Sequence, residues 1–85
     1  MKYLITYDLL TPGQNYRKLV TAISALGPCV NLGSSCWAVK SNLTAIQIRN
    51  SLANYIDRND LLFVCPFGSH AELHYKQEVI AWLNN

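Results

Sequence analysis

The order in which apolar periodicities change along this chain restricts its fold more than any other feature. Alternating or continuous apolar runs predict strands, and apolar residues three and four apart predict helices. The expected elements are a strand over 2–8, a helix over 16–26, strands over 29–32 and 36–40, a helix over 45–56 and a strand over 61–65. This β-α-β-β-α-β order predicts a ferredoxin-like α+β fold, in which a four-stranded antiparallel sheet carries two helices on one face.

Local signals mark the ends of these elements. Gly27 and Pro28 end the first helix, because neither residue favours helix continuation. Residues 11–14 have capping-box spacing ahead of that helix, and Thr44 with Gln47 forms the clearest capping box of the chain ahead of the second. The last strand is apolar at every position, which is typical of a strand that is covered on both faces.

The whole chain, 1–85, is expected to form one domain, because 85 residues leave no room for a second core. Its segment 68–85 is predicted to add a C-terminal helix. Ser69 and Glu72 have capping-box spacing there, ahead of an apolar stripe that ends at Leu83. That stripe requires a surface to pack on, either in this domain or in a second chain.

The composition favours self-association. Hydrophobic residues make up 51% of the chain and charged residues only 14%. A domain of this size buries only about 60–65% of its unfolded surface, so part of the apolar surface is expected to lie in a homodimer interface. The net charge of +2, with dispersed lysines and arginines, provides no basic patch that would by itself indicate nucleic acid.

The cysteines and the apolar runs indicate the compartment. Cys29, Cys36 and Cys65 are odd in number and lack Cys-x-x-Cys spacing, so neither a disulfide framework nor a zinc site is expected. The chain begins directly on its first strand, without a signal peptide, and no apolar run reaches the roughly 20 residues that span a bilayer. A cytoplasmic protein without membrane contact is therefore expected.

Asp8, at the end of the first strand, is the leading candidate for a functional residue. A carboxylate at the end of a rigid strand reaches solvent, which suits a metal ligand or a general base. Aspartate also closes strands in a structural role, by accepting hydrogen bonds from nearby backbone amides. The sequence leaves both roles open. Asp57 and Asp60 are expected at the end of the sheet opposite the start of the third strand, where they would not easily assist Asp8, although the sequence leaves a placement at the near end open.

Three short motifs occur at the ends of predicted elements. They are Tyr7-Asp8 after the first strand, Arg17-Lys18 at the first helix, and Ser35-Cys36-Trp37 at the third strand. In order and spacing they resemble the CRISPR-associated protein 2 superfamily, which includes virulence-associated protein D. The chain is also similar to short bacterial proteins labelled SinR-like, through its Tyr-Asp-Leu strand end, Pro-Gly-Gln loop, Ser-x-Trp strand and Asn-Leu-Thr-Ala helix start.

This resemblance implies a ferredoxin-like homodimer. Members of the superfamily are described as metal-dependent endonucleases in some cases and as non-catalytic scaffolds in others. Where cleavage is described, the strand-end aspartates of two protomers share a divalent metal. By this resemblance Asp8 is the catalytic and metal-binding residue, and Mg²⁺ or Mn²⁺ is the expected cofactor.

Three more residues are candidates for nucleic-acid binding. Arg17 and Lys18 either bind phosphates near the N-terminus of the first helix, where the macrodipole favours anions, or form a solvated helix face. Ser35 either contacts phosphate or a metal-bound water, or ends a turn, and the turn is favoured. Tyr7 and Trp37 are expected in the core rather than stacked on bases.

Three classes of function remain: a metal-dependent endonuclease acting on RNA or DNA, a non-catalytic dimer that binds nucleic acid or protein, and a toxin–antitoxin component. The endonuclease-like homodimer is favoured, because Asp8 would combine a rigid position with a symmetry mate. His70, His74 and Glu78 are spaced to share one helix face, but two histidines one turn apart more often occur by chance than in a metal site.

Overall fold

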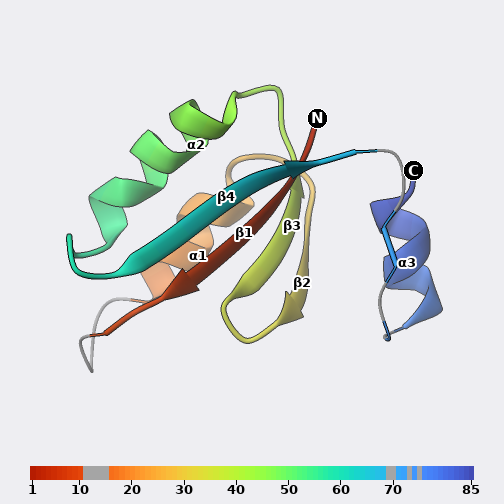
Figure 1. Cartoon of the computed structure of the whole chain (residues 1–85), viewed down its shortest axis with the longest axis horizontal. Helices are drawn as coiled ribbons and strands as arrows, with labels where there is room; N and C mark the ends of the chain where they lie inside the picture. Colours follow the sequence, from red (N-terminus) through yellow and green to blue (C-terminus); the bar gives the residue numbers. More distant parts are fainter. Residues whose placement is uncertain (11–15, 69–70, 73, 75) are drawn as a thin grey trace.

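The computed structural model has the expected α+β class (Figure 1). Its elements are β1 (Lys2–Asp8), α1 (Tyr16–Ser24), β2 (Cys29–Gly33), β3 (Cys36–Lys40), α2 (Ala45–Leu52), the 3-10 turn η1 (Ala53–Tyr55), β4 (Leu61–Phe67) and α3 (Gln77–Leu83). The residues that the structure describes are 1–10, 16–68, 71, 72, 74 and 76–85. The capping box expected over 11–14 lies outside them.

The four strands form one antiparallel sheet in the order β2-β3-β1-β4. The register sets Thr6 opposite Cys36 and Asp8 opposite Leu61, so the end of β1 meets the starts of β3 and β4. Asp57 and Asp60, which precede β4, therefore lie at the same end of the sheet as the start of β3. The expectation that they lie at the opposite end is wrong, because β3 and β4 both run antiparallel to β1.

The main core lies between the sheet and the two helices α1 and α2. Alternate β1 residues point into it, as their spacing predicts, and α1 and α2 contribute their apolar stripes. The buried members of this core are Tyr3, Ile5, Tyr7, Leu19, Ile23, Val39, Ile48 and Leu52. Burying one such aliphatic side chain contributes about 1.5–3 kcal/mol, so these eight positions provide most of the drive to fold.

The start of α2 confirms the capping box. The Gln47 amide donates to Thr44 Oγ1 at 3.2 Å, and the Thr44 amide donates to Gln47 Oε1 at 2.9 Å. Two of the unpaired amides of the first turn are thereby satisfied within four residues. The helix ends at Leu52, earlier than expected, and continues as the short 3-10 turn η1.

β4 is an edge strand, and the expectation that it is covered on both faces is wrong. Leu61 and Phe63 expose 59% and 51% of their surface. They lie on the face of the sheet opposite α1 and α2, which we call the open face. A continuous apolar run therefore arises here because one set of alternate side chains faces the core while the other set is exposed.

The C-terminal helix is shorter than predicted. Ala71, Glu72 and His74 are not helical, α3 begins only at Gln77, and Ser69 lies outside the described residues. The apolar stripe of α3 packs against one half of the open face, on Ala38, Val30 and Leu32. Its packing surface is therefore in the same domain, so the stripe no longer argues for a second chain.

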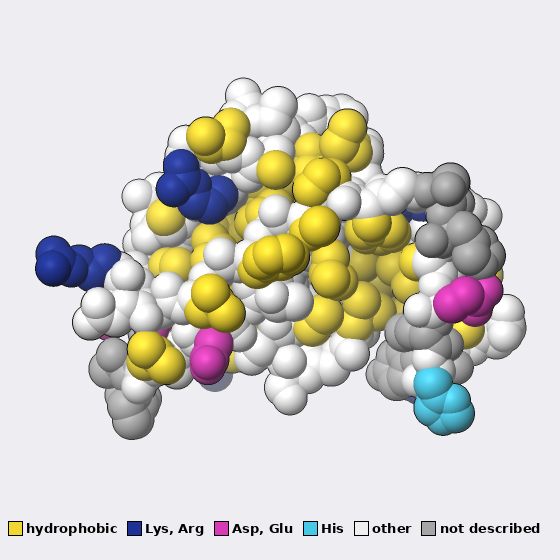
Figure 2. All heavy atoms as spheres, viewed as in Figure 1, with side chains coloured by type: hydrophobic (Ala, Val, Ile, Leu, Met, Phe, Trp, Pro, Cys, Tyr) yellow, Lys and Arg dark blue, Asp and Glu magenta, His cyan; other side chains and the backbone are white. Residues whose placement is uncertain are grey.

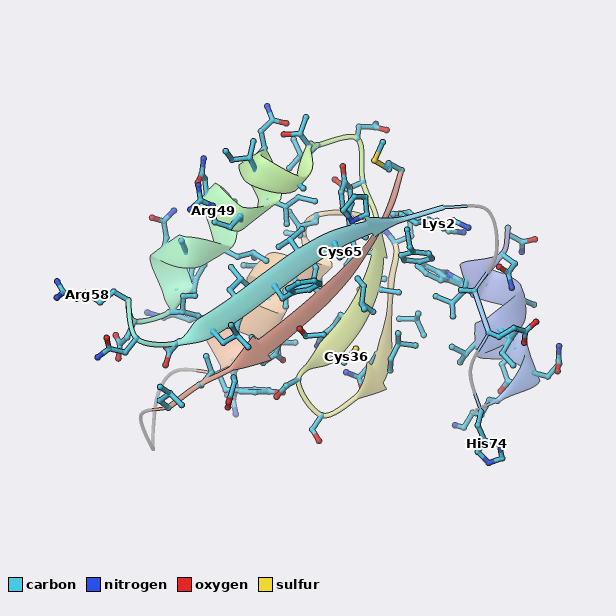
Figure 3. All side chains as sticks on the ribbon, in the orientation of Figure 1. Lys2, Cys36, Arg49, Arg58, Cys65 and His74 are labelled. Carbon is cyan, nitrogen blue, oxygen red and sulfur yellow. The ribbon has the colours of Figure 1, made fainter. Side chains whose placement is uncertain are left out.

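Polar contacts fix α3 to the sheet. The Lys2 ammonium points toward α3 (Figure 3) and donates to the Leu83 carbonyl at the C-terminal end of the helix, where the macrodipole favours a cation. Lys40 lies over the Trp82 ring, 4.4 Å from its centroid. Asn84 exchanges hydrogen bonds of 2.7 and 2.9 Å with the backbone of Ala71. No helix in the described part of the chain is long and apolar enough to cross a membrane.

Candidate functional site

The Asp8 side chain lies on the open face at the end of β1. The preceding residue, Tyr7, is buried under the helices, and alternation along the strand turns Asp8 to the other side. Its carboxylate is exposed and makes no hydrogen bond or ion pair with any described residue. The structural role, in which Asp8 closes the strand through backbone amides, therefore finds no support among those residues.

Asp60 takes that closing role instead. Its two carboxylate oxygens accept hydrogen bonds from the amides of Leu10 and Asp57, each at 2.8 Å. These bonds tie the chain leaving β1 to the turn that enters β4, and hydrogen bonds to a charged group contribute about 1.5–3 kcal/mol each. Because both oxygens are engaged with amides, Asp60 is a poor second metal ligand for Asp8.

Ser35 lies in the turn between β2 and β3, as expected, with a left-handed backbone φ of 62°. Its carbonyl accepts a hydrogen bond of 3.1 Å from the Tyr7 amide, and Ser35 lies close enough to the Tyr16 hydroxyl to help lower the pKa of that tyrosine. These contacts lie on the helix-covered side of the sheet. They bring Ser35 to the tyrosines and not to the Asp8 carboxylate.

A chain of hydrogen bonds links three aromatic side chains at this end of the sheet. Trp37 Nε1 donates to the Tyr7 hydroxyl at 3.3 Å, and that hydroxyl donates to the Tyr16 hydroxyl at 2.8 Å. Burial raises the pKa of Tyr7 to about 12, whereas the hydrogen bond from Tyr7 lowers the pKa of Tyr16 from its ordinary value. Tyr7 is in the core, as predicted, but nothing in the sequence indicated the polarised hydroxyl of Tyr16.

Replacing Tyr7 with phenylalanine should raise the pKa of Tyr16, because the Tyr16 phenolate loses its main hydrogen-bond donor. Ultraviolet titration measures this, with Tyr16→Phe as the control that identifies the Tyr16 signal.

In the wild type, Tyr7 titrates near pH 10 when unfolded and near pH 12 when folded, so its stabilising contribution is full below pH 10 and falls between pH 10 and 12. Tyr7→Phe should abolish that fall, and an unchanged Tyr16 titration would contradict the donor role.

The described residues of one copy provide few grouped ligands for a metal ion. They contain no group of three or more His, Cys, Asp or Glu side chains placed to hold one. His74 precedes α3 and so does not share a helix face with Glu78, and His70 lies outside the described residues. All three cysteines are free thiols, and burial raises the pKa of Cys36, which opposes a reactive thiolate. Asp8 belongs to no such group among the described residues.

Arg17 and Lys18 lie in the first turn of α1 with exposed side chains. The Tyr7–Tyr16 hydrogen bond ties the start of this helix to the end of β1. The two cations therefore lie at the same end of the sheet as Asp8 but on the helix-covered side. The structure does not bring the predicted phosphate-binding residues and the predicted metal ligand onto one surface of a single copy.

The open face is apolar between Asp8 and α3. Figure 2 shows hydrophobic side chains gathered across the middle of this view. Leu61 and Phe63 stand out from it, and a groove of about 260 Å³ separates the sheet from α3. The groove is lined by Leu4, Leu32, Cys65, Phe67, Ala71, Glu72 and Leu83. Exposed apolar surface of this kind typically marks an interaction site.

Comparison of the chain with known protein families, with curated proteins and with solved structures finds no match. Its function therefore has to be inferred from its own residues.

Proposed function

We propose that the chain is a metal-dependent, endonuclease-like protein that acts on RNA or DNA as a homodimer. In this proposal two copies associate through the open face, and their Asp8 carboxylates together bind Mg²⁺ or Mn²⁺. The proposal includes the ferredoxin-like class, which is supported by the central position of β1 and β3 and by two helices on one face. It also includes a cytoplasmic location, which fits three free thiols.

The observation that carries the proposal is an exposed carboxylate, without a partner among the described residues, at the edge of an exposed apolar surface. Between Asp8 and α3 the open face presents Thr6, Phe63, Leu4 and Cys65, none of which is charged. An uncharged, apolar sheet face is self-complementary, so a twofold axis through it buries the same side chains from both copies. Such an axis near the end of β1 would place the two Asp8 carboxylates side by side.

Two carboxylates are a chemically sufficient protein contribution to such a site. Magnesium sites commonly use one or two carboxylates, with waters and substrate phosphate oxygens as the other ligands. A bound divalent ion would polarise a phosphodiester and lower the pKa of a water molecule. The residues of this chain would contribute the position of the two Asp8 oxygens, which β1 holds through its pairing with β4.

The second candidate is a non-catalytic dimer that binds nucleic acid or protein, as a scaffold or as part of a toxin–antitoxin pair. It is favoured by the small number of acids that the described residues gather near Asp8. In that case the open face would still form the dimer, and Asp8 would only mark its edge. The two candidates share the interface and differ in the chemistry of Asp8.

Replacing Phe63 with glutamate should convert the dimer to monomers, because two glutamates near the axis would be desolvated and would repel each other. Light scattering at micromolar concentration measures the mass. The matched control is Ile46→Glu, since Ile46 is a comparably exposed aliphatic residue (61%) on α2, away from the open face. A wild-type protein that is monomeric, or a dimer insensitive to Phe63→Glu, would reject the open-face dimer.

Replacing Asp8 with asparagine should reduce metal-dependent cleavage of single-stranded RNA or DNA by at least about a hundredfold, because the metal loses its anionic ligand. Folding should be unaffected, since no described residue bonds the carboxylate. Glu78→Gln, at an exposed acid on α3, is the matched control and should cleave like the wild type. Cleavage that persists in Asp8→Asn, or that survives a chelator, would reject the nuclease, and wild-type binding without cleavage would favour the second candidate.

A further inference from the structure

A groove of about 460 Å³ lies on the helix-covered side of the molecule, between α1 and η1. It is lined by Arg17, Lys18, Thr21, Ala22, Ala25 and Tyr55. Its volume is within the range of small-ligand sites, which is about 300–1,000 Å³. The groove exists because Thr21 and Ala22 of α1, and Ala25 just after it, carry small side chains, where larger ones would fill it.

The groove is cationic at one end and mainly apolar in its middle. Arg17 and Lys18 place positive charge at the first turn of α1, where the helix dipole also favours an anion. The Arg17 side chain makes no hydrogen bond or ion pair with a described residue. The Thr21 hydroxyl donates to the Arg17 carbonyl at 2.9 Å and is thus used inside the helix, so the middle of the groove is mainly apolar.

Tyr55 forms the aromatic wall of the groove. It is 40% exposed and belongs to η1, beyond the apolar stripe of α2 that faces the core. The helix expected over 45–56 would have included Tyr55, but α2 ends at Leu52 and the 3-10 turn changes the direction of the following side chains. Its ring is therefore left at the surface, beside two cations and two alanines.

We propose that this groove binds one nucleotide of a single-stranded nucleic acid, with the phosphate on Arg17 and the base stacked on Tyr55. A guanidinium forms charge-assisted hydrogen bonds with phosphate, and an aromatic ring accepts any base by stacking. Duplex bases are already stacked on one another, so the groove selects single strands. An acidic peptide would pair with the cations, but it would provide no planar ring to stack on Tyr55 or to cover the two lining alanines.

The proposal deepens the proposed function and rests on it in taking nucleic acid as the ligand. Arg17 and Asp8 lie at one end of the sheet on opposite sides. A strand held in the groove would therefore pass around that end toward the carboxylate. In the non-catalytic alternative the same groove would be the binding site itself.

The test is fluorescence anisotropy with a short labelled single strand of mixed sequence, as DNA and as RNA, in a chelator so that cleavage does not interfere. Tyr55→Leu should weaken binding about tenfold, whereas Tyr55→Phe should bind like the wild type because it keeps the stacking surface. Arg17→Ala should weaken binding and lower the slope of log K against log salt by about 0.7. Arg49→Ala, at an exposed cation of α2 that does not line the groove (Figure 3), is the matched control and should change binding less.

A second variant guards against a folding defect in Tyr55→Leu. Ala25→Glu, at an exposed groove position just beyond the end of α1, should fold by circular dichroism and should weaken binding at least tenfold, because its longer, negatively charged side chain would occupy part of the groove and repel a polyanion. Equal binding by the wild type and the folded groove variants would overturn the groove, as would equal losses in Arg49→Ala and Arg17→Ala. Those results leave the nuclease test unaffected, since Asp8→Asn should bind like the wild type in the chelator and fail only in cleavage.

Discussion

Replacing Gly27 with alanine should lower the free energy of unfolding of the domain by about 3–5 kcal/mol, although the substitution adds only one methyl group. The added Cβ would lie 2.1 Å from the Lys40 carbonyl oxygen, and the Gly27 φ of +151° is rarely adopted by other residues. The backbone cannot move away, because the Lys40 amide donates to the Pro28 carbonyl at 2.8 Å. A domain of this length has a total stability of roughly 4–13 kcal/mol, so Gly27→Ala would lose a large part of it.

Urea denaturation followed by circular dichroism measures this loss. Gly33→Ala is the matched control, since Gly33 has a similar φ of +138° but open space around its Cβ, so only backbone strain of about 1–3 kcal/mol is expected. Gly68→Ala has neither problem and should be neutral. Equal losses at Gly27 and Gly33 would mean that strain, and not the close approach to Lys40, makes Gly27 necessary.

The sequence predicted the elements of this fold because their signals are local. Alternation over 2–8 reports which β1 side chains enter the core, and the Thr44–Gln47 capping box depends on four consecutive residues. Only one role of Gly27 can be predicted locally. The sequence indicates that Gly27 ends the first helix, but its closeness to Lys40 depends on the chain entering β2 beside the end of β3, which no local pattern contains.

What the sequence missed depends on strand order. An apolar run such as 61–65 looks the same in a central strand and in an edge strand with one exposed apolar face, so the position of β4 could not be predicted. The site shows the same limit. Asp8 was found as a strand-end acid, but the closing role of Asp60 arises from a hydrogen bond to Leu10, 50 residues away in the chain. The Tyr16 hydroxyl likewise gained its partner Tyr7 only through the packing of α1 against β1.

Replacing Leu83 with aspartate should release α3 while the rest of the domain stays folded. Leu83 is buried against Ala38, and leaving an unpaired carboxylate there would cost about 3–5 kcal/mol, more than the packing of so short a helix provides. The seven residues of α3 are too few to remain helical alone, so the released segment should unfold. The core between α1, α2 and the sheet shares no buried residue with the α3 cluster and should keep its stability.

Trp82 provides the readout, because it packs on Lys40 only while α3 is docked. In Leu83→Asp its fluorescence should shift to the red, while near-ultraviolet circular dichroism of the aromatic core around Tyr7 and Trp37 is retained. Ala81→Asp, at an exposed position of the same helix, is the control and should behave like the wild type. Loss of the Tyr7–Trp37 signal together with the Trp82 shift would mean that α3 unfolds with the core as one unit. If α3 alone is released, the open face gains the apolar surface around Ala38, and the particle mass of Leu83→Asp should exceed that of the wild type as this surface associates with other copies.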